Sequence, residues 1–80
     1  MSQKVKLIWD FRGEPSAKIA EHHKKHLDEY IQMGEIEGAF TSVEKVNDMH
    51  HIAFMVVTKN WMNSLREQLK PHRGQLYTEN

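Results

Sequence analysis

The sequence predicts a single α+β domain, residues 1–80, in which strands and helices follow one another in the order β-α-β-β-α-β. Three observations support this prediction. Apolar and polar residues alternate near the start of the chain, apolar residues then recur at helical spacing, and a continuous apolar run occupies 52–57. A chain of 80 residues has the length of one domain and builds only a thin core.

The first half of the chain supplies a strand, a helix and a second strand. Residues 4–11 alternate as a half-buried strand does. From Pro15 to about Met33 the apolar residues share one side of a helix, and Gly34 suits its end. Those apolar residues are Ile19, Ala20, Leu27, Tyr30 and Ile31. Residues 38–48 predict a half-exposed strand with Phe40, Val43 and Val46 as its apolar side chains.

The second half supplies a central strand, a helix and a last strand. Residues 50–57 predict a strand that is apolar on both faces. Asn60, or Thr58, is placed to cap a helix that runs to about Lys70, before Pro71. Its buried side would consist of Trp61, Met62, Leu65 and Leu69. Residues 74–80 predict a short final strand.

This order of elements is the signature of the ferredoxin-like fold. Right-handed connections then give a four-stranded antiparallel sheet of strand order 4-1-3-2, with both helices on one face. The central strand 50–57 is apolar on its other face too, so we expect that face to be covered. The simplest cover is the same face of a second subunit, which predicts a homodimer. The alternative is a strand whose exposed side is merely hydrophobic.

The composition argues against several classes of protein. Lys and Arg number 11 and are balanced by 11 Asp and Glu, so there is no excess charge for nucleic acid. The absence of cysteine excludes disulfides and thiolate sites. The apolar run 52–57 is too short to cross a bilayer, and the first residues do not form a signal peptide. We therefore expect a cytoplasmic protein without nucleic-acid or membrane partners.

The predicted topology brings histidines from distant segments together. The end of the first strand lies beside the start of the third, and the loop before the last strand opens at that same end. We therefore expect this end of the sheet to collect the following residues: Asp10, Arg12, His50, His51, His72 and Arg73. His23 falls on the apolar side of the first helix, pointing toward the sheet, and His26 lies at the edge of that side.

These residues suggest a histidine-lined cleft that binds a small polar or anionic molecule and supports acid–base chemistry. His23 or His26 would be the acid or base, and Asp10 would orient the imidazole. The expected ligand contacts are Arg12, His51, His72 and Arg73. A core role for His23 is the plainer alternative, and Asp10 would face away from the helices if Trp9 takes the helix side. The sequence identifies no cofactor.

Two other functions are compatible with the same residues. One is a non-enzymatic dimerisation module whose histidines make it sensitive to pH. The other is divalent-metal binding by His22 and His26, spaced one helical turn apart, with a third histidine from the sheet. The leading interpretation assigns no residue as a metal ligand.

The stretch HHKKHLDEYIQMGEI, residues 22–36, resembles the helix of the YCII-like proteins of the dimeric α/β-barrel superfamily. The resemblance implies a ferredoxin-like subunit that dimerises through its sheet, with a small cleft and a histidine–aspartate pair. By its His-Leu dipeptide the family histidine is His26, and by its spacing to Gly34 it is His23. Where the family has a later Asp-Pro, this chain has Lys70-Pro71.

Overall fold

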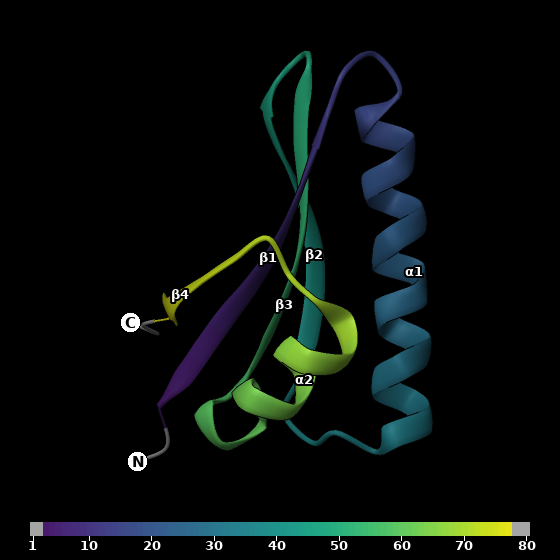
Figure 1. The fold of residues 1–80 in the computed structure, drawn as a ribbon. Helices are drawn as coiled ribbons and strands as arrows, with labels where there is room; N and C mark the ends of the chain where they lie inside the picture. Colours follow the sequence, from purple (N-terminus) through teal and green to yellow (C-terminus); the bar gives the residue numbers. More distant parts are fainter. Residues whose placement is uncertain (1–2, 78–80) are drawn as a thin grey trace.

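The computed structural model describes residues 3–77 and contains the predicted order of elements (Figure 1). They are β1 (Lys4–Arg12), α1 (Ser16–Gly34), β2 (Phe40–Asn47), β3 (His50–Thr58), the short 3-10 helix η1 (Lys59–Trp61), α2 (Met62–Leu69) and β4 (Arg73–Tyr77). The last strand begins one residue before its predicted start. Its predicted final residues, 78–80, lie outside the described residues.

The four strands form one antiparallel sheet of order β2-β3-β1-β4, which is the predicted order 4-1-3-2 seen from the other edge. β1 and β3 are paired along their whole length, from Lys4 opposite Thr58 to Arg12 opposite His50. β4 pairs only with the first half of β1, up to Ile8. The α+β class and the antiparallel sheet are therefore confirmed.

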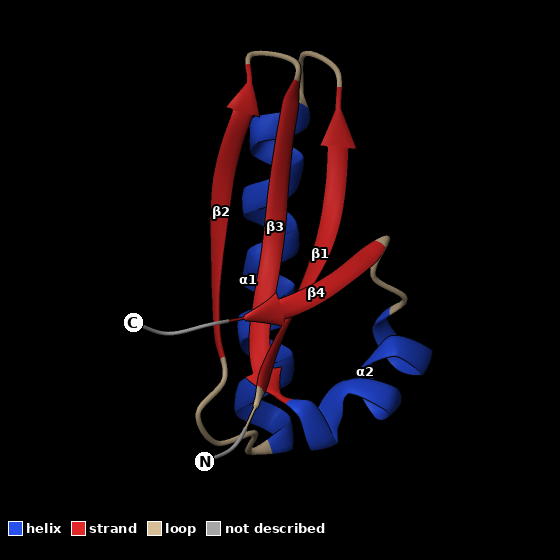
Figure 2. Cartoon of the chain, turned by 90° about the vertical axis from the view of Figure 1, so that its left-hand side faces the viewer, coloured by secondary structure: helices blue, strands red, loops and turns tan. Residues whose placement is uncertain are grey.

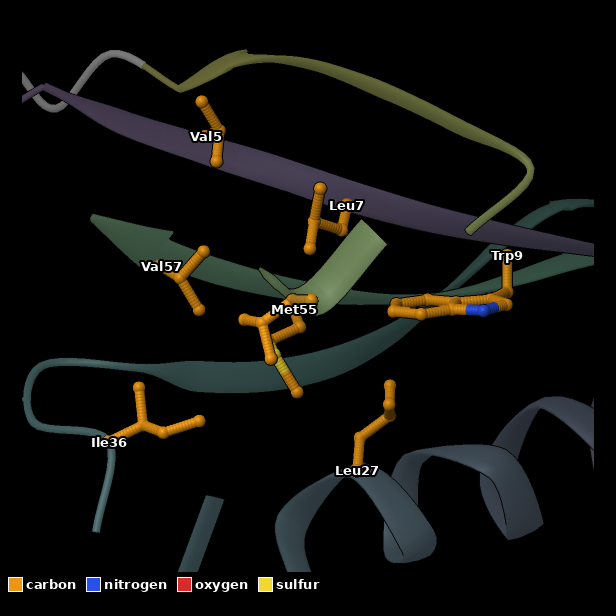
Figure 3. Close-up of a cluster of buried hydrophobic side chains, with 8 residues drawn as sticks. Val5, Leu7, Trp9, Leu27, Ile36, Met55 and Val57 are labelled. Atoms are coloured by element: carbon orange, nitrogen blue, oxygen red, sulfur yellow. The ribbon is translucent and has the colours of Figure 1, made fainter. Parts of the chain in front are cut away.

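The main core lies between the sheet and the two helices. Alternation along β1 and β3 turns one set of side chains toward the helices, and residues from α1, α2 and the segment after α1 close over them (Figure 3). The cluster consists of Val5, Leu7, Trp9, Leu27, Ile36, Met55, Val57 and Leu65. Because Leu27 and Leu65 belong to the same cluster, α1 and α2 cover the same face of the sheet.

The boundaries of α1 follow the predicted signals closely. Pro15 precedes the first helical residue, and the helix ends at Gly34. Glu35, with a φ of 51°, takes the left-handed conformation there, and the N–H of Ile36 donates to the carbonyl of Ile31. One predicted core residue is placed wrongly by the helical pattern: Ile19 is 43% exposed, whereas Ser16 and Ala20 in the same turns of α1 are fully buried.

The segment predicted as one second helix is divided. Thr58 precedes η1, which turns the chain into α2, and only Leu65 of α2 is fully buried. Trp61, Met62 and Leu69 are partly buried against the core. Lys70 ends α2 in a left-handed conformation before Pro71, since a residue preceding proline is disfavoured in the helical region.

The predicted second strand is more exposed than its apolar residues suggest. Phe40 and Val46 are both exposed, whereas Val43 is half-buried. β2 is an edge strand, and its pairing with β3 shifts between Lys45 and Asn47. This irregularity takes the end of the strand away from the regular alternation of the sheet.

The sheet face away from the helices, called the far face below, is covered within the single chain. Ile8, Ile52, Phe54 and Val56 form a second cluster and are 2, 3, 9 and 0% exposed. β4 crosses this side of the sheet obliquely (Figure 2), and Tyr77 packs on the cluster and contacts Phe40. A second subunit is therefore not needed to bury the apolar residues of β3.

Candidate functional site

A cleft of about 440 Å³ lies between α2 and the strands β1 and β4, and it is called the α2–β4 cleft below. β4 leans toward the far face and away from α2 (Figures 1 and 2). Its apolar wall consists of Val5, Leu7, Met62, Pro71 and Leu76. Its polar wall consists of Lys59, Arg66, His72, Arg73 and Gln75, with Gly74 between them. Clefts of this size accommodate small organic molecules.

The charged groups in the wall of the α2–β4 cleft are all positive. Arg66 makes no ion pair with any residue in the range 3–77, and within that range the ammonium of Lys59 donates only to the side-chain oxygen of Gln3, at 3.4 Å. Among residues 3–77, no carboxylate lines the cleft. Although the chain carries no net charge, this cleft is locally cationic.

The third cation, Arg73, is held by Asp10. Its Nε and Nη2 donate to the two oxygens of the Asp10 carboxylate at 3.0 and 3.1 Å. His50 Nε2 lies 2.8 Å from the same carboxylate, so Asp10 links β1, β3 and β4. The hydrogen bond from Arg73 is the main cause that lowers the pKa of Asp10, with His50 adding to it against the opposing effect of burial. The same carboxylate raises the pKa of Arg73.

His72 is fixed by two backbone hydrogen bonds to β1. Its own N–H donates to the carbonyl of Ile8 at 2.9 Å, and its Nδ1 accepts from the N–H of Asp10 at 2.8 Å. An imidazole that accepts at Nδ1 carries its proton on Nε2. The tautomer of His72, which lines the α2–β4 cleft, is therefore set by its hydrogen bond to β1.

The other two expected ligand contacts lie elsewhere. His51 is on the helix side of β3, where its Nδ1 is 2.8 Å from the hydroxyl of Ser16, a fully buried residue at the start of α1. Arg12 is exposed at the end of β1, opposite His50. Of the four expected contacts, the cleft contains His72 and Arg73.

The expected partnership between Asp10 and a helix histidine is not formed. Trp9 takes the helix side of β1, so Asp10 points to the far face, where it meets His50 and Arg73. His23 points toward the sheet as predicted and packs against Trp9 and Phe11, with ring centroids 4.9 and 5.4 Å away. His26 is exposed on α1. None of Asp10, His23 and His26 lines the α2–β4 cleft.

The environment of His23 is unfavourable for a charged imidazole. Its Nε2 is buried and has no hydrogen-bond partner. Burial lowers the pKa of His23, and the nearby His26, His72 and His22 lower it further when they are protonated. The structure thus favours a neutral, packed side chain at this position.

Replacing His23 with leucine is expected to stabilise the protein by about 1 kcal/mol, because it removes a buried nitrogen without a partner. Chemical denaturation at pH 7.5 measures the change. His26→Leu is the matched control, since it makes the same change of residue at an exposed position of α1. An equal gain in both variants would attribute the effect to helix propensity and contradict the expectation.

Lys59 and Arg66, the cleft cations without an ion pair in the range 3–77, were not among the predicted site residues. One signal for them existed. The two cations are seven residues apart, which is about two helical turns, so they fall on the same side of the segment that carries α2. The same spacing is common on the solvent-exposed side of a short helix. The two cations become part of a site only because β4 forms the opposite wall of the cleft.

Comparison with known proteins identifies no relative of this chain. No protein-family model matches the chain, and neither a curated protein nor a solved structure matches it. Within residues 3–77, no helix is long and apolar enough to cross a membrane.

Proposed function

We propose that this protein binds a small organic anion with an apolar part in the α2–β4 cleft. The observation that supports this function is the composition of the cleft wall, in which the described part of the chain supplies apolar side chains and cations but no carboxylate. An anionic group would meet Arg66 and Lys59, and the apolar part would lie against Met62, Pro71 and Leu76, the apolar lining residues that are at least partly exposed.

Asp10 contributes to this site indirectly. By binding the guanidinium of Arg73 through two hydrogen bonds, it holds the strand that forms one wall of the cleft and neutralises that arginine. The charge that attracts the ligand is therefore that of Arg66 and Lys59. His72 is held by β1 and lines the cleft, so the proton on its Nε2 would be available to an acceptor atom on the ligand.

A titration of the ¹⁵N-labelled protein with sodium benzoate tests this proposal. We expect benzoate to shift the backbone amides of Val5, Leu7 and Gly74, which surround the cleft. Benzamide, which has the same ring without the charge, should bind more weakly. Arg66→Gln should lower the affinity for benzoate by about three- to fivefold, the usual effect of an exposed charge pair.

Arg12→Gln is the matched control, because Arg12 is also exposed and does not line the cleft. Its affinity for benzoate should equal that of the unaltered chain. Equal binding of benzoate and benzamide, or equal affinities in the two arginine variants, would refute the proposal.

Three finer expectations accompany this function as proposals. The strand order and the helices on one face support a ferredoxin-like fold. The homodimer through the far face stays a prediction, and its remaining support is the half-exposed Phe40 beside Tyr77. Acid–base chemistry by His23, His26 or Asp10 also stays a prediction, separate from binding in the α2–β4 cleft.

A further inference from the structure

Two histidines on the exposed side of α1 lie side by side, with their rings facing each other. Neither of them lines the α2–β4 cleft. His22 and His26 are four residues apart, and their Nε2 atoms are separated by 3.0 Å. The rings are nearly perpendicular, with centroids 4.6 Å apart and an interplanar angle of 81°. In the chain alone, one Nε2–H donates to the other Nε2 across this gap.

We propose that His22 and His26 bind a divalent transition-metal ion of the Zn²⁺ class through their Nε2 atoms. Two metal–nitrogen bonds of about 2.05 Å place their nitrogens about 2.9 Å apart at a right angle and about 3.4 Å apart at the tetrahedral angle. The observed separation of 3.0 Å lies within this range. The ion replaces the shared proton, and the side chains keep their spacing.

Glu29 supports the same assignment of nitrogens. Its carboxylate lies 3.5 Å from Nδ1 of His26, one helical turn further along α1. A carboxylate on one ring nitrogen keeps the proton there and leaves the other nitrogen to bind metal, an arrangement common around metal-ligating histidines. His26 is thus oriented with Nε2 toward His22.

The site has two protein ligands. No third His, Asp or Glu within residues 3–77 completes a cluster around it, so water would fill the remaining positions. His23, although adjacent in sequence, points toward the sheet with its Nε2 buried. Imidazole ligands favour Cu²⁺, Ni²⁺ and Zn²⁺ over Mg²⁺ and Ca²⁺.

The test is calorimetric titration of the chelator-treated protein with ZnCl₂ at pH 7.5, followed by NMR of the histidine side chains. We expect one Zn²⁺ per chain and selective shifts of the His22 and His26 Nε2 resonances. His22→Ala and His26→Ala should each lower the affinity for Zn²⁺ at least tenfold. Glu29→Gln should lower it by a smaller factor while both imidazoles stay in place.

Lys25→Ala is the control on the same helix, because it alters an exposed residue between the two histidines. It should bind Zn²⁺ like the unaltered chain. Unchanged affinity in His22→Ala or His26→Ala would overturn the proposal. Loss of binding in His72→Ala, with both helix variants unaffected, would also overturn it by moving the site to the sheet. None of these variants changes Arg66, so the result is independent of anion binding.

Discussion

Replacing Asp10 with alanine is expected to lower the free energy of unfolding by about 3 kcal/mol, since hydrogen bonds to a charged group are lost and a buried donor is left unpaired. The Asp10 side chain is 16% exposed and binds both Arg73 and His50. His50 is buried, so its Nε2 would lose its acceptor. Asp10→Asn should cost less, because the amide oxygen can still accept from His50. Urea denaturation at pH 7 measures both variants.

The stabilisation by Asp10 should also depend on pH. Its pKa is lowered in the folded protein from the ordinary value of 3.8, chiefly by Arg73. The folded state therefore holds fewer protons at this group, and the stabilisation is fully present above pH 3.8 and lost as the pH falls through the lowered pKa. Asp48→Ala is the control, because the Asp48 side chain is exposed and its one ion pair within residues 3–77 is with Lys45, three residues away. A stability difference between Asp10→Ala and the unaltered chain that stays constant down to pH 2 would contradict this account.

Replacing Tyr77 with alanine is expected to cost about 2 kcal/mol, less than for a fully buried ring, because Tyr77 is only half-buried. The ring packs on the far-face cluster and contacts Phe40, with centroids 5.9 Å apart. Its removal uncovers apolar side chains of β3. We therefore also expect increased self-association, which sedimentation velocity measures.

Leu76→Ala is the matched control for Tyr77→Ala. Leu76 is the neighbouring residue of β4 and is 64% exposed on the other side of the strand. It should leave both stability and sedimentation nearly unchanged. Equal effects of the two substitutions would show that Tyr77 does not cover the far face. The sedimentation of the unaltered chain at the same concentration tests the predicted homodimer directly.

The sequence predicted the fold well because most elements have strong local signals. The alternation of β1, the apolar run of β3 and the start and end of α1 all depend on neighbouring residues. The cover of the far face could not be predicted in this way. It depends on how β4 leans across the sheet and on the contact between Tyr77 and Phe40, which are distant in sequence.

The candidate site and the polar cluster around Asp10 beside it were predicted in part, for a similar reason. Antiparallel pairing brought His50, His72 and Asp10 to one end of the sheet as expected. Which face Asp10 occupied was open, because both Ile8 and Trp9 are apolar and either could enter the main core. The indole of Trp9 took that place, where its N–H donates to the carbonyl of Leu69 at 3.1 Å. Asp10 therefore pairs with Arg73 and not with His23.

The attachment of β4 has a consequence for how the α2–β4 cleft responds to its medium. β4 is an edge strand of five residues, the kind of element that opens locally before the whole domain unfolds. The ion pair between Arg73 and Asp10 is one of its side-chain tethers to the sheet, at the end opposite Tyr77. Dissolved salt screens that pair and also screens the attraction of Arg66 and Lys59 for an anion. Rising ionic strength thus loosens the wall that β4 forms and weakens the attraction between the cations and a bound anion. Both effects favour release of the anion.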